Sequence, residues 1–93
     1  MKKFFYRVCR GDTLLSVCNR LNAPVFAVIK NNNITREIKE GDLIYIESFE
    51  NAHKILPFED LPALARRLRV SEGEILLKNG NPPYFYYGLT VYL

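Results

Sequence analysis

Apolar positions near the N-terminus follow first the period of a strand and then the period of a helix. Tyr6 and Val8 are apolar at alternate positions, which predicts a half-buried strand over residues 5–9. A second set of apolar residues recurs at the spacing of one helix face: Leu14, Val17, Cys18 and Leu21. They predict an amphipathic helix over residues 13–21. Gly11 lies between the two elements and can turn the chain at little steric cost.

The pattern next predicts a second helix and a second strand. Pro24 suits the first turn of a helix. Three residues of this helix are expected to face inward: Val25, Val28 and Ile29. The run Asn31-Asn32-Asn33 ends it, because asparagine tolerates the left-handed conformation at a helix C-terminus. After a turn at Gly41, a strand is expected over residues 43–46. Two strands separated in this way can pair antiparallel, with both helices on one face.

The second half of the chain repeats the first half 47 positions later. Residues 6–46 align with residues 53–93 without a gap. Six aligned pairs are identical: Leu14 and Leu61, Arg20 and Arg67, Leu21 and Leu68, Asn32 and Asn79, Gly41 and Gly88, and Tyr45 and Tyr92. Most apolar positions agree as well. Agreement in both period and register indicates an internal duplication.

The duplication predicts the elements of the second half. A short strand is expected at residues 55–56, followed by a helix that Asp60 caps and that runs through residue 68. Ser71 begins the S-x-x-E pattern of a capping box, which predicts the start of another helix. Residues 89–93 are expected to form the last strand.

Residues 47–52 are short and polar, so we interpret them as a linker between two units, residues 1–48 and 49–93. The predicted fold class is α+β. Each unit is a βααβ arrangement in which two helices pack on one face of a two-stranded antiparallel sheet.

Composition narrows the function classes. The chain has 93 residues, 48% of them apolar, which suits one ordinary domain or two very small ones. The net charge of +3 comes from residues 1–48, with 8 basic minus 5 acidic side chains. A dedicated nucleic-acid binder usually has a clustered basic stripe, so we expect no nucleic-acid partner.

No apolar run approaches the roughly 20 residues of a membrane span, so no membrane insertion is expected. Arg7 and Arg10 interrupt the apolar run that a secretory signal needs.

Neither catalysis nor metal binding is predicted. Cys9 and Cys18 are expected to be reduced thiols, since two cysteines do not make a disulfide scaffold. His53 is the one histidine, and no C-x-x-C spacing accompanies it, so we interpret it as a strand residue rather than a zinc ligand. No nucleophile, base and orienting group can be assembled. We therefore expect no cofactor and no enzymatic activity.

Residues 6–48 resemble a LysM domain. The motif is carried by Tyr6, Val8, Gly11-Asp12-Thr13-Leu14, Val17-Cys18, Val28-Ile29, Asn32, Ile38, Gly41 and Leu43-Ile44-Tyr45-Ile46. The second unit resembles a diverged LysM domain through Leu61, Leu64-Ala65, Val70-Ser71, Ile75-Leu76, Asn79 and Gly88. There, Phe58-Glu59-Asp60-Leu61 replaces the glycine turn, so a different loop shape is expected.

The resemblance implies a βααβ fold and recognition of polymers that contain N-acetylglucosamine, either peptidoglycan or chitin. In LysM domains the sugar lies in a shallow groove between the first turn and the loop after the second helix. One wall would consist of Gly11, Asp12, Thr13 and Leu14, and the other of Asn32, Asn33 and Ile34, with Ile38 nearby. We therefore expect a non-catalytic glycan-binding protein that acts chiefly through its first unit. An association with spore or cell-wall material fits this expectation.

Structural roles compete with these binding roles. Asp12 and Thr13 are both suited to capping a helix, and Asn32 to stopping one. Pro82–Gly88 contains an aromatic run that could stack on sugars or bases, but we favour rings that fill a core or cover the other unit.

Two other function classes remain open. In one, the fold has lost sugar binding and serves as a protein-interaction or assembly module of the spore or cell envelope. In the other, the chain is a weak nucleic-acid binder, whose affinity would fall steeply with salt, unlike that for a neutral sugar.

Overall fold

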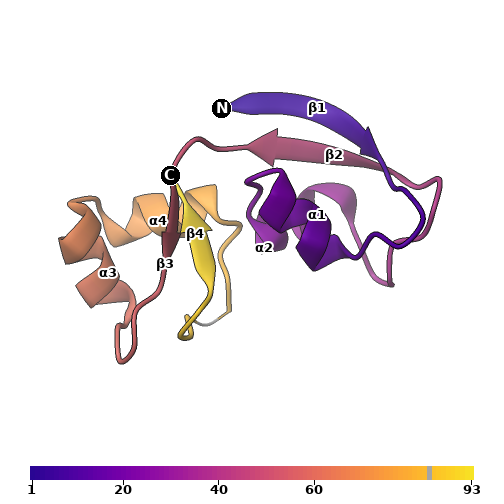
Figure 1. Ribbon diagram of the computed structural model, residues 1–93. Helices are drawn as coiled ribbons and strands as arrows, with labels where there is room; N and C mark the ends of the chain where they lie inside the picture. The colour runs from indigo at the N-terminus through magenta and orange to yellow at the C-terminus, as the bar shows by residue number, and fades with distance from the viewer. Residues whose placement is uncertain (84) are drawn as a thin grey trace.

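The computed structural model describes residues 1–83 and 85–93 and contains two small antiparallel sheets, each with two helices. The elements follow in the order β1 (Lys2–Arg7), α1 (Leu14–Arg20), α2 (Val25–Asn32), β2 (Leu43–Ser48), β3 (Ala52–Lys54), α3 (Leu61–Leu68), α4 (Glu72–Lys78) and β4 (Thr90–Tyr92). β1 pairs with β2, and β3 pairs with β4 (Figure 1). The predicted α+β class with two βααβ units is confirmed.

The first strand of each unit lies earlier in the chain than predicted. β1 covers Lys2–Arg7 rather than residues 5–9, and β3 covers Ala52–Lys54 rather than residues 55–56. Val8 and Ile55, which follow these strands, are buried and exchange backbone hydrogen bonds with the turn before the last strand instead. The ends of these strands are set by pairing with the neighbouring strand. Polar residues such as Lys2 take part in this pairing, although the apolar pattern of the sequence does not include them. β2 also extends to Ser48, so the segment between the sheets is shorter than predicted.

Thr13, and not Asp12, caps α1. The Thr13 hydroxyl accepts a hydrogen bond from the Ser16 N–H (3.2 Å), and the Ser16 hydroxyl accepts one from the Thr13 N–H (3.1 Å). The Asp12 carboxylate instead accepts from the Cys9 N–H at 2.8 Å, so it closes the turn before the helix. At the end of α2, Asn33 adopts the left-handed conformation (φ 50°), as predicted for the asparagine run.

One asparagine in each unit joins the second helix to the last strand. The Asn32 side-chain amide donates to the carbonyls of Val28 (2.8 Å) and Tyr45 (2.9 Å), and its oxygen accepts from the Tyr45 N–H (2.7 Å). Asn79 makes the same three bonds 47 positions later. The duplication found in the sequence is therefore also a repeated hydrogen-bond framework.

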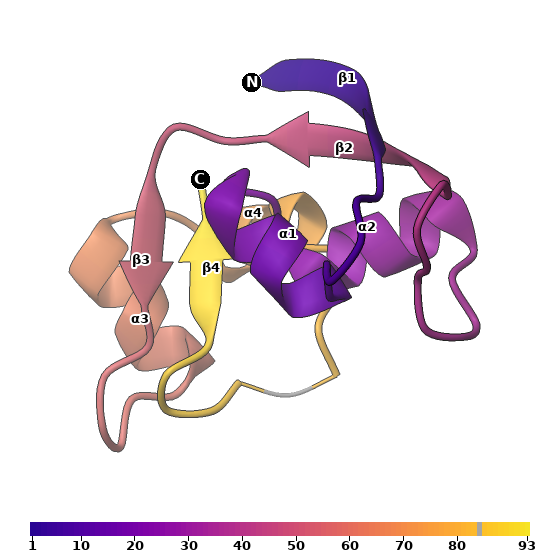
Figure 2. The ribbon, with the colours of Figure 1, turned by 45° about the vertical axis from the view of Figure 1, so that its right-hand side comes forward.

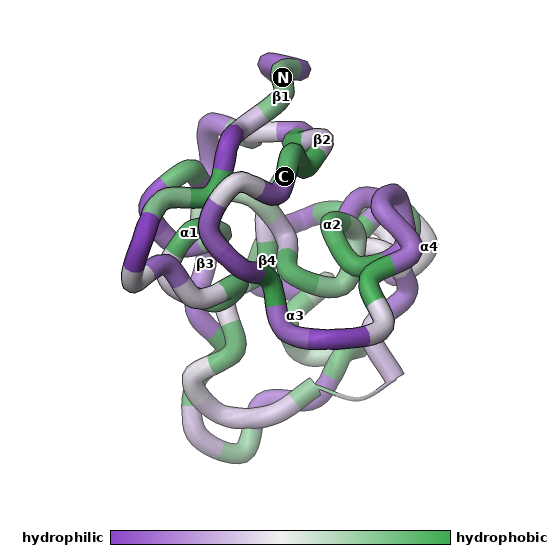
Figure 3. The backbone as a smooth tube through the Cα atoms, turned by 90° about the vertical axis from the view of Figure 1, so that its right-hand side faces the viewer, coloured by the Kyte–Doolittle hydropathy of each residue, from purple (hydrophilic) through white to green (hydrophobic). Residues whose placement is uncertain are grey.

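Each unit has its own apolar core. The first consists of Val8, Val17, Cys18, Ala23, Val28, Ile44 and Ile46. The second consists of Ile55, Leu64, Ala65, Ile75, Leu89 and Val91. Hydrophobic and hydrophilic segments alternate along both units, as expected for elements with one buried face (Figure 3). The thiols are free: Cys9 is exposed, and burial raises the pKa of the Cys18 thiol to about 12.

The two units pack against each other. Phe26 of α2 packs against the second core, although it belongs to the first unit. Gly80, just after α4, lies so close to α2 that a Cβ atom there would be 2.4 Å from the Ala27 nitrogen. Tyr92 is only 3% exposed and, together with Leu15, Asn19 and Asn22 of the first unit, lines a hollow at one face of the β3–β4 sheet. Figures 1 and 2 show α1 and α2 beside β4 and α4.

The first turn of the second unit keeps the shape of the glycine turn, contrary to the expectation of a different loop shape. Phe58 has a φ of 61°, where Gly11 has 86°. In both turns, the N–H of the following carboxylate residue donates to a carbonyl three positions earlier at 3.1 Å. The turn hydrogen bonds thus hold an aromatic residue in a conformation that favours glycine, with its side chain fully in solvent.

Replacing Phe58 with glycine is therefore expected to stabilise the protein by about 0.5–1 kcal/mol. Removing the left-handed strain gains about 1–2 kcal/mol, and the added freedom of the unfolded chain offsets part of it. Urea unfolding measures the change. The reverse substitution at the matching position, Gly11→Phe, should lower the free energy of unfolding. If both substitutions changed the free energy of unfolding in the same direction, strain at the positive φ would not be the cause.

Candidate functional site

A half-buried carboxylate fixes the turn that leads into α1. The Asp12 carboxylate accepts hydrogen bonds from the Tyr6 hydroxyl (2.5 Å) and the Cys9 N–H (2.8 Å), and Arg20 lies 3.6 Å from it. The bond from Tyr6 lowers the pKa of Asp12, and the same bond raises the pKa of Tyr6 to about 12. Asp12 is therefore ionised at neutral pH, and its lone pairs are largely used inside the protein.

The matching turn in the second unit uses the same device. The Glu59 carboxylate accepts from the Leu56 N–H (3.0 Å) and forms an ion pair with Arg67 at 2.7 Å. Hydrogen bonds from Arg67 lower the pKa of Glu59 to about 2. Both turns are thus fixed by a carboxylate–arginine pair at duplicated positions.

The loop after α2 faces the first of these turns. This loop begins at Asn33, which ends α2. The Ile34 N–H donates to the Ile29 carbonyl at 3.0 Å and so ties the start of the loop to the helix. Ile34 and Ile38 are half-buried and pack against the first core, which anchors the loop. Within residues 1–83 and 85–93, the backbone N–H and C=O groups of Thr35 and Ile38 make no hydrogen bond with the chain. They are available to a ligand.

A hollow of about 460 Å³ lies between the turn and the loop, and we call it the first-unit groove. Five of the eight residues nominated from the sequence line it: Asp12, Thr13, Leu14, Ile34 and Ile38. Four further lining residues were missed: Ile29, Thr35, Arg36 and Glu37. The charged side chains at positions 36 and 37 gave no motif signal, although their place in the loop between two nominated residues could have pointed to them.

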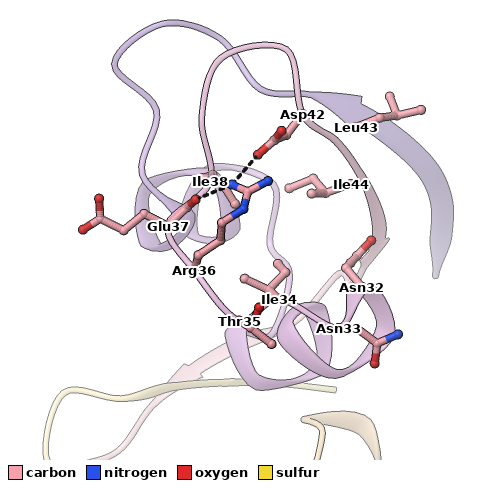
Figure 4. A pocket seen from close by; sticks show the side chains of 10 residues that line it. All are labelled: Asn32, Asn33, Ile34, Thr35, Arg36, Glu37, Ile38, Asp42, Leu43 and Ile44. Atoms are coloured by element: carbon pink, nitrogen blue, oxygen red, sulfur yellow. Dashed lines mark hydrogen bonds and ion pairs between the residues drawn. The ribbon is translucent and has the colours of Figure 1, made fainter.

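The other three nominated residues lie outside the first-unit groove. Gly11 sets the turn through its positive φ. Asn32 and Asn33 line a neighbouring hollow of about 240 Å³, which the same loop borders (Figure 4). Because the Asn32 side chain bonds to backbone groups of α2 and β2, it serves to position the loop.

Arg36 lines both of these hollows and braces the loop. Its guanidinium donates to the Glu37 carbonyl at 2.9 Å and lies 3.5 Å from the Asp42 carboxylate (Figure 4). Asp42 also accepts from the Lys39 N–H, and this backbone bond is the main reason that its pKa is lowered. The groove therefore combines apolar side chains, unpaired peptide groups and a charged rim.

In the described part of the chain, no three His, Cys, Asp or Glu side chains gather as a metal site would need. None of the helices described has the length and apolarity for crossing a membrane. An apolar surface beside free peptide groups can take a ligand that carries both an amide and a methyl group.

Comparisons with known proteins give a fold likeness only. No family model and no curated protein matches the sequence. Among solved structures, the chain is similar to the spore cortex-lytic enzyme SleL of Bacillus cereus (14% identity, TM-score 0.48) and of Bacillus megaterium QM B1551 (17%, 0.48). The matches cover 99% and 96% of this chain but only 23% and 22% of those chains. The chain thus spans less than a quarter of their length, and this likeness assigns it neither a family nor an activity.

Proposed function

We propose that this chain is a non-catalytic module that binds polymers containing N-acetylglucosamine, peptidoglycan or chitin-like, through the first-unit groove. The observation that carries the proposal is that Leu14, Ile34 and Ile38 line one hollow, and that the peptide groups of two lining residues, Thr35 and Ile38, have no partner among the described residues. The resemblance of residues 6–48 to a LysM domain supports the same ligand.

The chemistry of the ligand matches the groove group by group. An N-acetyl substituent offers a carbonyl, an N–H and a methyl group. The peptide groups of Thr35 and Ile38 can bond its amide, while Leu14 and Ile34 can receive its methyl. In this proposal Asp12 and Thr13 support the wall through their turn and cap, and Gly11, Asn32 and Asn33 position it.

An amide NMR titration with N-acetylglucosamine oligomers of increasing length tests the proposal. Amide shifts should cluster at residues 12–14 and 34–38 and should grow with oligomer length, because longer chains fill more of the groove. If millimolar oligomer shifts no amide there, the glycan proposal fails.

Blocking the groove is expected to weaken binding. Thr35→Trp fills the hollow from an exposed position and should reduce affinity at least tenfold, about 1.4 kcal/mol. Lys30→Trp adds the same ring to an exposed α2 position outside the lining and serves as the control. Equal affinities of the two variants would show that the ligand lies elsewhere.

A specific surface favours protein interaction as a second candidate function. The first turn of the second unit exposes Leu56 (47%) and Phe58 (107%), and the nearby loop exposes Tyr87 (72%). The first unit has Cys9, Gly11 and a charged loop at the matching positions. Exposed apolar groups gathered at one end of a protein are typical of a contact with another protein. Binding of a protein partner that survives Thr35→Trp but is lost in Phe58→Gly would favour this function.

A further inference from the structure

A third hollow, of about 470 Å³, lies between the units, and we call it the inter-unit cleft. One side comes from α1 and its C-terminal end, with Leu15, Asn19 and Asn22. The other side is the outward face of the β3–β4 sheet, with Lys54, Thr90 and Tyr92, and Tyr86 lies at its border. Because it needs both units, no single LysM-like unit would contain it.

The side chains of the inter-unit cleft suit a sugar. Leu15 is 60% exposed and Tyr86 is 45% exposed, so apolar surface is available to the face of a ring. Across residues 1–83 and 85–93, the side chains of Asn19, Asn22 and Lys54 make no hydrogen bond within the chain. Amide and ammonium groups beside aromatic surface can bond hydroxyl and carbonyl oxygens.

Charge separates the inter-unit cleft from the first-unit groove. Lys54 is the one charged residue among the described residues that line the cleft. The first-unit groove is lined by Asp12, Arg36 and Glu37, which leave a formal excess of one negative charge. An anionic substituent is therefore attracted to the cleft and disfavoured in the groove.

The first-unit groove and the inter-unit cleft adjoin along one helix. Leu14 lines the first-unit groove, and Leu15, the next residue of α1, lines the inter-unit cleft. Consecutive helical residues project about 100° apart, so the first turn of α1 separates two neighbouring binding surfaces. A polymer seated in the groove can continue past α1 into the cleft.

We propose that the inter-unit cleft is a second glycan subsite in which Lys54 pairs with a carboxylate on the polymer. This inference rests on the proposed function and names its ligand class: an acidic, peptidoglycan-type strand, whose alternate sugars carry carboxylate-bearing substituents, in preference to a neutral chitin-type strand. The groove takes the N-acetyl group, and the cleft takes the acidic substituent.

Two oligomers with the same number of sugars test the inference by NMR and calorimetry: a neutral N-acetylglucosamine oligomer and a peptidoglycan fragment with carboxylates. Both should shift the amides of residues 12–14 and 34–38. The acidic fragment should also shift Asn19, Asn22 and Lys54, and more strongly than the neutral oligomer does. At low salt it should bind about two- to fivefold tighter, as expected for one exposed ion pair.

Lys54→Gln should remove that preference and leave binding of the neutral oligomer unchanged. Lys3→Gln, which neutralises an exposed lysine on the other sheet, is the matched control and should keep the preference. If the acidic fragment shifts only the groove amides, or if Lys54→Gln keeps the preference, the inference is overturned while the proposed function stands. If neither oligomer shifts the groove amides, the proposed function itself fails and the inference falls with it.

Discussion

Gly80→Ala is expected to destabilise the protein strongly and to loosen the contact between its units. The added methyl group would meet the backbone of α2, with the Ala27 nitrogen and Cα at 2.4 and 2.6 Å, and a backbone cannot rotate away as a side chain can. Overpacking of this kind costs about 1–3 kcal/mol. The positive φ of 76° adds about 1–2 kcal/mol for a residue with a Cβ.

Gly88→Ala separates the two contributions. Gly88 has a φ of 92°, but a Cβ there would meet nothing within 4 Å, so this variant should lose only the backbone part. Urea unfolding gives the difference between the variants, and the amide shifts of Ala27 and Tyr92 report the contact between the units. Equal losses for Gly80→Ala and Gly88→Ala would mean that α4 does not approach α2 as closely as described.

Asn79→Ala is expected to destabilise the protein about as strongly as Gly80→Ala. Asn79 is 2% exposed, and its side chain satisfies both the N–H (2.8 Å) and the carbonyl (3.0 Å) of Tyr92. Alanine leaves these two buried backbone groups without a partner, at a cost of about 1–3 kcal/mol each. Natural domains of this size have a total stability of only about 5–15 kcal/mol, so a large part would be lost.

The duplication supplies a graded comparison for this variant. Asn32→Ala removes the same three bonds in the first unit, where the site is only part-buried, so water can replace some of them and the loss should be smaller. Asn19→Ala changes an exposed asparagine and should stay within about 0.5 kcal/mol of the native protein. An unfolding midpoint for Asn79→Ala that matches that of Asn19→Ala would refute the bridging role.

Local periodicity predicted the helices well, because the apolar face of each helix packs on its own unit. The helix face of Leu14, Val17 and Cys18 is an example, and it could be recognised without any partner. The ends of the strands depended on residues across the sheet, which is why β1 begins at Lys2. Phe26 shows the same limit: it is out of phase with its own helix because it packs against the second core. The division into residues 1–48 and 49–93 stays a prediction.

The candidate site was predictable only as far as a motif extends. The resemblance nominated both walls of the first-unit groove, but Thr35 and its neighbours became visible only through their position in the loop. The prediction of a different loop shape at Phe58 was wrong. A phenylalanine rarely adopts a positive φ, but the hydrogen bonds of the turn and the Glu59–Arg67 pair impose it here. Of the aromatic run, Tyr84 lies outside the described residues, Phe85 packs on the second core, and Tyr86 and Tyr87 remain exposed.

Because of Phe26, the second core depends on the first unit, whereas the first core does not depend on the second unit. The first core is built entirely from residues up to Ile46, whereas the second receives a ring from α2. During synthesis from the N-terminus, the first half can finish its core before the second half leaves the ribosome. It then presents Phe26 as a preformed nucleation surface for the later half. The order of translation therefore matches the order in which the chain can fold.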